Sequence, residues 1–157
     1  MIVWKKNGEK LNQKVLDEFE KEEGVSLPES YKTFMLETNG GMPKGDYVFA
    51  YNDEVSGRLN HSVIQDFFVL YPEDNYEVNN LKNFCHMLWS DKALSEDMFP
   101  FAEDPAGNYL CFSLNESDYG VVYYCNHEYI NVETEYLMSS KVADSFAEFV
   151  NMLVLDE

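Results

Sequence analysis

The sequence lacks the features that would place the protein in a membrane or in an oxidising compartment. None of its apolar runs approaches the roughly 20 residues that span a bilayer, so we expect no membrane partner. Residues 1–9 (MIVWKKNGE) place their charges after the apolar residues and contain no apolar run of about 7–15 residues, in contrast to a signal peptide. The three cysteines (Cys85, Cys111 and Cys125) lie 26 and 14 residues apart, which indicates neither a disulfide framework nor a Cys-x-x-Cys metal site. These absences predict a cytoplasmic protein with free thiols.

The sequence also lacks the common catalytic and cofactor-binding signatures. It contains no Gly-x-Ser-x-Gly turn, no phosphate-binding loop and no Gly-x-Gly-x-x-Gly motif. The three histidines (His61, His86 and His127) do not share a spacing that binds zinc. The segment Asn39-Gly40-Gly41 follows a predicted helix instead of opening one, so we interpret it as a helix cap and not as a phosphate cradle. We therefore predict a protein without catalytic activity and without an obligatory cofactor.

One group of carboxylates keeps a rival hypothesis open. Glu103 and Asp104 follow an apolar run and could bind a divalent cation, with Glu128 nearby if the next hairpin folds back. A metal-dependent hydrolase is then the alternative class. However, residues 104–107 (DPAG) also form a good β-turn by themselves, with aspartate first and proline second, and adjacent carboxylates on a turn are more often only solvated.

Basic side chains are scarce, most of all in the C-terminal part of the chain. The sequence has 11 basic against 29 acidic residues, a net charge of −18 and a pI near 4.3. Residues 1–92 carry 10 basic and 16 acidic side chains (net −6), whereas residues 93–157 carry only Lys141 against 13 acidic ones (net −12). Such a field repels nucleic-acid phosphates and anionic lipids and attracts a basic protein partner. The alternative is that the acidity serves only solubility.

What the sequence does contain indicates one globular domain over residues 1–157. Hydrophobic residues make up 45% and aromatic residues 15% of the chain, enough to bury a core. Apolar spacing predicts helices at residues 11–23, 28–38, 81–89 and 142–153, and strands at residues 46–51, 63–70, 109–114, 120–125 and 129–132. Helices near both ends with strands between them indicate an α+β fold with a mainly antiparallel sheet. The predicted core includes six rings: Phe19, Tyr31, Phe34, Phe112, Phe146 and Phe149.

Several short segments, in their order along the chain, resemble the SUKH superfamily. The resemblance covers roughly residues 9–154, and its members include yeast regulators of cell-wall synthesis and many bacterial immunity proteins. It implies an α+β fold whose N-terminal and C-terminal helices pack on a sheet. The matching segments are residues 27–34 (LPESYKTF), 39–43 (NGGMP), 99–104 (FPFAED), 107–108 (GN), 120–124 (GVVYY), 127–128 (HE) and 142–149 (VADSFAEF).

The resemblance implies a function in protein binding. Compact bacterial members are mostly immunity proteins that neutralise a polymorphic toxin, commonly a nuclease, encoded beside them. The alternative is a regulatory protein-binding module of the same superfamily. A nuclease needs a basic cleft for phosphates, which an acidic protein can occupy. We expect six residues to lie on or near the contact surface, with Tyr119 as an aromatic anchor: Glu103, Asp104, Asn108, Asp118, Tyr119 and Glu128. Residues 55–80 match no segment of the resemblance, so partner-specific surface is expected there.

Overall fold

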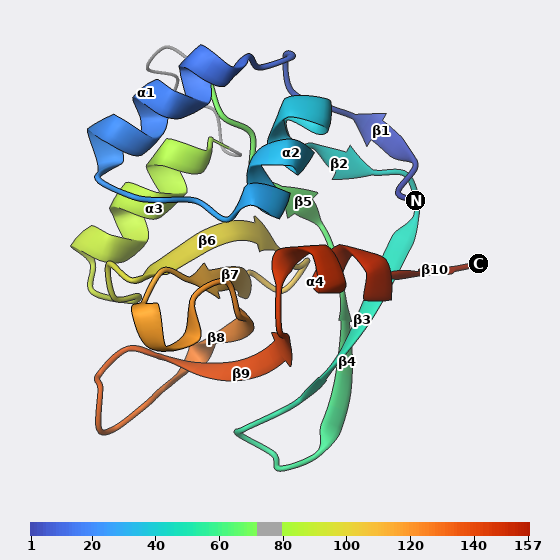
Figure 1. Ribbon diagram of the computed structural model, residues 1–157. Helices are drawn as coiled ribbons and strands as arrows, with labels where there is room; N and C mark the ends of the chain where they lie inside the picture. Colours follow the sequence, from blue (N-terminus) through green and yellow to red (C-terminus); the bar gives the residue numbers. More distant parts are fainter. Residues whose placement is uncertain (72–79) are drawn as a thin grey trace.

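The computed structural model describes residues 1–71 and 80–157, and within these ranges the chain has an α+β fold (Figure 1). Its α-helices are α1 (Gln13–Glu23), α2 (Glu29–Thr38), α3 (Leu81–Ser90) and α4 (Phe146–Met152), and a short 3₁₀-helix, η1, spans Glu116–Asp118. The strands form three antiparallel sheets. The predicted fold class, with N-terminal and C-terminal helices beside a mainly antiparallel sheet, is confirmed.

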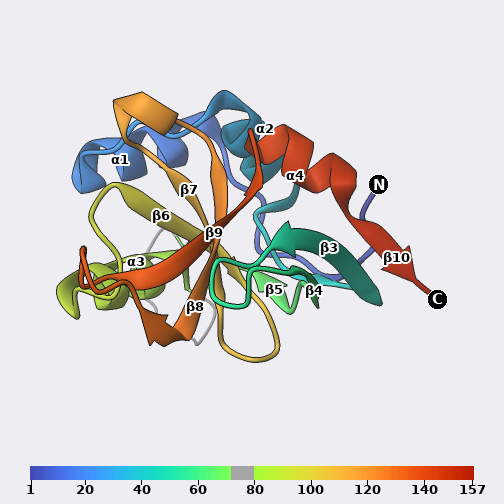
Figure 2. The same cartoon turned by 90° about the horizontal axis from the view of Figure 1, so that it is seen from below.

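A five-stranded sheet forms the centre of the fold. Its strands follow the order β5 (Asp66–Phe67), β6 (Met98–Glu103), β7 (Tyr109–Ser113), β8 (Val122–Ile130) and β9 (Leu137–Ala143). A three-stranded sheet has the order β10 (Val154–Asp156), β3 (Asp46–Asn52) and β4 (Leu59–Val63), and a two-stranded sheet pairs β1 (Trp4–Lys6) with β2 (Met42–Pro43). Seen from below, β3 and β4 lie beside β9 (Figure 2), where the backbone N–H of Glu54 donates to the Ser140 hydroxyl at 2.9 Å. The two larger sheets therefore meet along β9.

The helices begin and end where the sequence supplies caps. The Asn12 side chain accepts from the N–H of Val15 and begins α1, and Gly24, with φ of 67°, ends it. Asn39 ends α2 with φ of 49°. The Ser145 hydroxyl accepts from the N–H of Glu148 and begins α4. The predicted start of the last helix at residue 142 is therefore wrong, because Val142 still belongs to β9.

Aromatic rings dominate the core. Tyr31 on α2 is in ring contact with Phe99 and Phe112 of the central sheet and with Phe146 of α4, with centroids 5.0–5.9 Å apart. Such edge-to-face contacts add to the energy of apolar burial. Of the six predicted core rings, Phe34 is half-buried and packs against the core, and the other five are buried.

The opposite face of the central sheet carries a smaller cluster. Neighbouring residues of a strand point to opposite faces, so Phe112 joins the main core while Cys111 packs with Cys125, Leu88 and Leu94. The predicted free thiols are confirmed, since all three cysteines are buried and unpaired by disulfides. Helix α3 contributes Leu88 to this cluster, whereas its Leu81 and Cys85 belong to the main core.

Two predicted strands differ from the structure. The predicted strand at residues 63–70 is interrupted, because β4 ends at Val63 in one sheet and the chain crosses at Gln65 into the short β5 of another. The predicted strand at residues 129–132 is the end of one long strand, β8, which stops at Ile130. Asn131 begins the turn that leads into β9, which the apolar spacing did not predict.

Candidate protein-binding surface

The β6–β7 turn (residues 104–108) is held by a buried polar network. Asp104 is 3% exposed, and its carboxylate accepts from the N–H groups of Ala106 (3.0 Å) and Asn108 (2.9 Å). It also accepts from the Ser62 hydroxyl on β4 at 2.9 Å and from the Tyr124 hydroxyl on β8. The Asp104 carboxylate thus accepts hydrogen bonds from its own turn, from β4 and from β8. The sequence instead suggested a solvated turn.

Asn108 extends this network toward the surface. Its side-chain amide donates to the Tyr124 hydroxyl at 2.7 Å, and its side-chain oxygen accepts from the backbone N–H of His127 at 3.0 Å. Asn108 is buried like Asp104. Both predicted contact residues therefore lie near the molecular surface but beneath it, where they shape the turn. Their part in partner binding stays a prediction.

Glu103 faces a second carboxylate across the strands. It lies opposite Asp66 of β5 in the antiparallel register, and Asp66 is only 4% exposed. Burial, followed by the charges of Asp66 and Asp104, raises the pKa of Glu103 to about 7. Burial also raises the pKa of Asp66. Glu103 is therefore partly protonated at neutral pH. Across residues 1–71 and 80–157, no three histidine, cysteine or acidic side chains are grouped so as to hold a metal ion.

Glu128 lies on the end of the β8–β9 hairpin, residues 128–136, which carries apolar and acidic side chains together. The exposure of the apolar side chains was not predicted from the sequence: Tyr129 is 45%, Ile130 61% and Val132 91% exposed. The acidic side chains Glu128, Glu133 and Glu135 are exposed beside them. Three exposed apolar residues among acids form the kind of surface that binds a protein partner. The signal in the sequence was three apolar residues within the four positions 129–132, bordered by Glu128 and Glu133.

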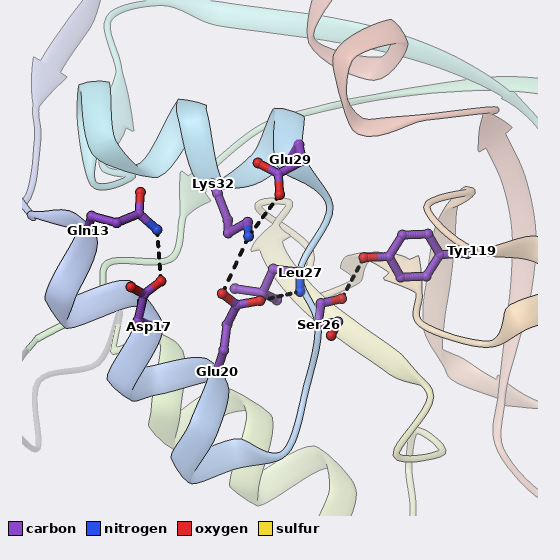
Figure 3. Close-up of polar contacts among 8 residues, drawn as sticks. All are labelled: Gln13, Asp17, Glu20, Ser26, Leu27, Glu29, Lys32 and Tyr119. Atoms are coloured by element: carbon purple, nitrogen blue, oxygen red, sulfur yellow. Dashed lines mark hydrogen bonds and ion pairs between the residues drawn. The ribbon is translucent and has the colours of Figure 1, made fainter.

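Tyr119, the predicted aromatic anchor, is attached to the helical layer. Its hydroxyl donates to the Ser26 carbonyl at 2.6 Å, while the side chain remains 46% exposed. Figure 3 shows this contact beside the Glu20 carboxylate, which accepts from the Leu27 N–H at 2.9 Å and pairs with Lys32 at 3.5 Å. Tyr119 thus fastens the β7–β8 connection to the α1–α2 loop. The exposed part of the residue is what remains available to a partner.

The six predicted contact residues fall into two groups. Glu103, Asp104 and Asn108 lie at one end of β7, and the hydrogen bond between Asn108 and His127 brings Glu128 close to them. Asp118 and Tyr119 follow the other end of β7. Five strand residues separate the two ends, a distance of roughly 17 Å. One contact surface that includes both groups must therefore extend along the strand.

The excess of acidic side chains lies on the outside of the molecule. Of the 13 acidic residues in 93–157, ten are exposed. Lys141, the only basic residue of this part, pairs with Asp144 at 2.5 Å. The exposed acids therefore keep most of their charge uncompensated. They are Glu96, Asp97, Glu116, Glu128, Glu133, Glu135, Asp144, Glu148, Asp156 and Glu157.

The segment expected to carry partner-specific surface is described in part. Val55 and Leu59 are exposed at the end of the β3–β4 hairpin, which projects from the body of the fold (Figure 1). Residues 72–79 lie outside the described residues. The assignment of this segment to partner binding stays a prediction.

Comparison with known proteins gives one result for nearly the whole chain. The family model of the SMI1 / KNR4 family (SUKH-1) matches residues 10–152. A search of curated proteins finds no match. In the described ranges, none of the helices has the length and apolar character needed to cross a membrane.

Proposed function

Because the chain belongs to the SMI1 / KNR4 family (SUKH-1), we propose that it is a cytoplasmic immunity protein that binds and neutralises a polymorphic toxin with nuclease activity. Family membership supports an immunity or regulatory role in general. The observation that carries the toxin proposal is the surface of residues 93–157, where ten exposed acidic side chains are accompanied by one lysine. A nuclease that binds nucleic-acid phosphates presents a positively charged surface.

The two kinds of side chain on the β8–β9 hairpin end have separate tasks in this proposal. The acidic ones attract the basic toxin from a distance and raise the association rate above the roughly 10⁵–10⁶ M⁻¹s⁻¹ of neutral pairs. Tyr129, Ile130 and Val132 are exposed in the free chain, and binding buries their apolar surface away from water. They therefore slow dissociation. Inhibition follows from occlusion of the toxin's active site or substrate groove.

The proposal includes no catalytic step. The hydrolase alternative would need the Asp104 carboxylate as a metal ligand. That carboxylate already accepts hydrogen bonds from Ser62, Tyr124 and its own turn, which supports a structural role for it. Calorimetric titration with Mg²⁺, Mn²⁺ and Zn²⁺ tests this point. Micromolar binding that is lost in Asp104→Asn would favour the hydrolase alternative.

A coexpression experiment tests the immunity role. The C-terminal domain of a large secreted protein encoded beside this gene is expressed in cells with and without this chain. We expect survival only with the chain. Equal death in both cultures, with both proteins soluble, overturns the assignment for that pair and favours the regulatory alternative.

The contribution of charge is tested by matched variants. The triple variant E128Q/E133Q/E135Q removes three exposed charges from the hairpin end, and E9Q/E18Q/E37Q removes three exposed charges from the N-terminal part. We expect the first variant to slow association with the toxin domain about tenfold at low salt, and the second to slow it much less. Equal effects of the two variants would show that net charge, not this surface, attracts the partner.

A further inference from the structure

A hollow of about 230 Å³ lies beneath the β8–β9 hairpin end, next to η1. Leu94, Met98 and Leu137 form an apolar wall, and polar side chains line the rest: Ser95, Asn131, Thr134 and Ser139. Two tyrosines, Tyr123 and Tyr136, also line it, and both are half-exposed. Asp118 is the charged residue in the described lining. The hollow thus combines an apolar wall, two aromatic rings and one carboxylate.

The Asp118 carboxylate retains capacity for a cationic ligand. One oxygen accepts from the Ser113 hydroxyl at 2.5 Å and the other from the Tyr123 hydroxyl at 2.6 Å. These two neutral donors fix the orientation of the carboxylate but leave its charge uncompensated. A carboxylate offers about four acceptor positions, so about two remain. In the part of the chain that the structure describes, no lysine, arginine or histidine forms an ion pair with Asp118.

Tyr123 remains a donor at physiological pH. Burial, followed by its hydrogen bond to Asp118 and the charge of that carboxylate, raises the pKa of Tyr123 to about 12. An adjoining hollow of about 370 Å³ shares Leu94 and Tyr136 with the first, and Lys92, Glu96 and Asp97 line it. The charged residues that line the two hollows, Asp118, Lys92, Glu96 and Asp97, therefore carry a net charge of −2, which matches a cationic occupant.

We propose that this hollow binds an arginine side chain of the partner protein. The aliphatic part of arginine packs against the apolar wall, and its guanidinium group donates to the free positions of Asp118. The rings of Tyr123 and Tyr136 offer aromatic surface to the planar cation, which favours arginine over the compact ammonium group of lysine. The biological meaning of this site rests on the proposed function, whereas the binding of arginine can be measured without any toxin.

Titration followed by NMR tests the site with the chain alone. The probe is N-acetyl-arginine amide, which carries a guanidinium group and no other charge. We expect millimolar binding that shifts the signals of Tyr123 and Tyr136, about tenfold tighter than binding of N-acetyl-citrulline amide, the neutral analogue of similar shape. N-acetyl-lysine amide should bind several times more weakly than the arginine probe. Equal binding of arginine and citrulline probes, or no shift at these tyrosines, overturns the proposal.

Two variants and one control locate the binding. Asp118→Asn should weaken the arginine probe about tenfold because the charge is lost. Tyr136→Leu keeps Asp118 intact and should weaken the probe several-fold while reducing the preference over lysine. Glu116→Gln removes an exposed charge of the same 3₁₀-helix outside the hollow and should leave binding unchanged. If Asp118→Asn perturbs the fold, Tyr136→Leu still decides: unchanged binding in that variant overturns the site.

The two proposals fail in different ways. If the arginine probe binds as expected but the chain protects no cell from the neighbouring toxin domain, the immunity role fails and the site stands. If the chain protects cells and Asp118→Asn retains full affinity for the toxin domain, the site is not used and the immunity role stands.

Discussion

The N-terminal part of the chain and its C-terminal part use their charged side chains differently. Residues 1–44 carry seven basic and eight acidic side chains, a net charge of −1. Several of these are paired, as in Lys32 with Glu20 and Glu29, at 3.5 and 3.0 Å. Residues 93–157 carry one basic and 13 acidic side chains. In the first region basic side chains are about as numerous as acidic ones and pair with them, whereas in the second region ten of the 13 acids are exposed beside a single lysine.

This comparison separates stability from binding. Exposed ion pairs contribute little to folding, so the fold rests on the aromatic core and on buried polar groups. Exposed acids without partners slightly oppose folding through mutual repulsion but favour an encounter with a basic protein. Substitutions in the core should therefore change the free energy of unfolding, and substitutions at the hairpin end should change only partner binding.

The largest effect is expected in the core. Phe146 is 1% exposed and is in ring contact with Tyr31 and Phe101. Phe146→Ala should lower the free energy of unfolding by about 3–5 kcal/mol, because it removes a buried ring and leaves a cavity. Urea denaturation followed by fluorescence measures it. A loss below about 1 kcal/mol would contradict the assignment of this ring to the core.

The next effect is expected in the Asp104 network. Asp104→Asn keeps the shape of the side chain but replaces one acceptor oxygen by a donor that faces other donors. The free energy of unfolding should fall by about 1–3 kcal/mol. Glu116→Gln, an acid-to-amide change at an exposed position, serves as the control and should stay within about 0.5 kcal/mol of the parent protein. Equal stability of the two variants would mean that the network is dispensable.

A smaller, pH-dependent effect is expected at Glu103. Its pKa is raised to about 7 in the folded chain, so the folded state binds this proton more tightly than the unfolded state, where the pKa is about 4.5. The contribution of Glu103 to stability is therefore most favourable below about pH 4.5 and is lost as the pH rises through about 7. Glutamine does not ionise, so Glu103→Gln should not lose stability in this pH range.

The pH effect is measured by urea denaturation of both proteins at pH 5 and pH 8. After an allowance for solvent screening, Glu103→Gln should gain about 1–2 kcal/mol relative to the parent protein between the two pH values. Glu128→Gln, at an exposed position, should show no such gain. If the free energy of unfolding changed equally with pH in the parent protein and in Glu103→Gln, the pKa of Glu103 would not be raised.

The smallest effect on folding is expected at the hairpin end. Ile130→Ser with Val132→Ser changes two strongly exposed side chains, so the free energy of unfolding should change by less than about 0.5 kcal/mol for each. The same variant should dissociate from the toxin domain faster, and its association rate should be nearly unchanged. Surface plasmon resonance separates the two rates. If the variant instead lowered the free energy of unfolding and left the dissociation rate unchanged, the hairpin end would serve folding and not binding.

Local signals in the sequence predicted much of the fold. Helix ends were predictable because Gly24 and Asn39 adopt the left-handed conformation that ends a helix. The hairpin of β7 and β8 and most of the core rings followed from apolar spacing. The predicted resemblance to the SUKH superfamily is confirmed by the match over residues 10–152.

Features that depend on distant residues were not predictable. The burial of Asp104 depends on Ser62 and Tyr124, which periodicity cannot place beside it. Likewise, β9 was missed because Ser139 and Ser140 interrupt its apolar alternation, and its pairing with β8 stabilises it nonetheless. The hollow at Asp118 depends on Leu94, Met98 and the β8–β9 hairpin end, which periodicity cannot place beside it, so its surroundings could not be predicted.

The Asp104 carboxylate also has a consequence for how the chain folds. Its bonds to Ala106 and Asn108 span two and four residues, so they can form as soon as the turn closes. Ser62 lies 42 residues before it and Tyr124 lies 20 residues after it. Closing longer loops costs more chain entropy, which makes distant contacts slower to form. We therefore expect the hydrogen bonds within the turn to form before the bond to Ser62, which joins the three-stranded sheet to the five-stranded one.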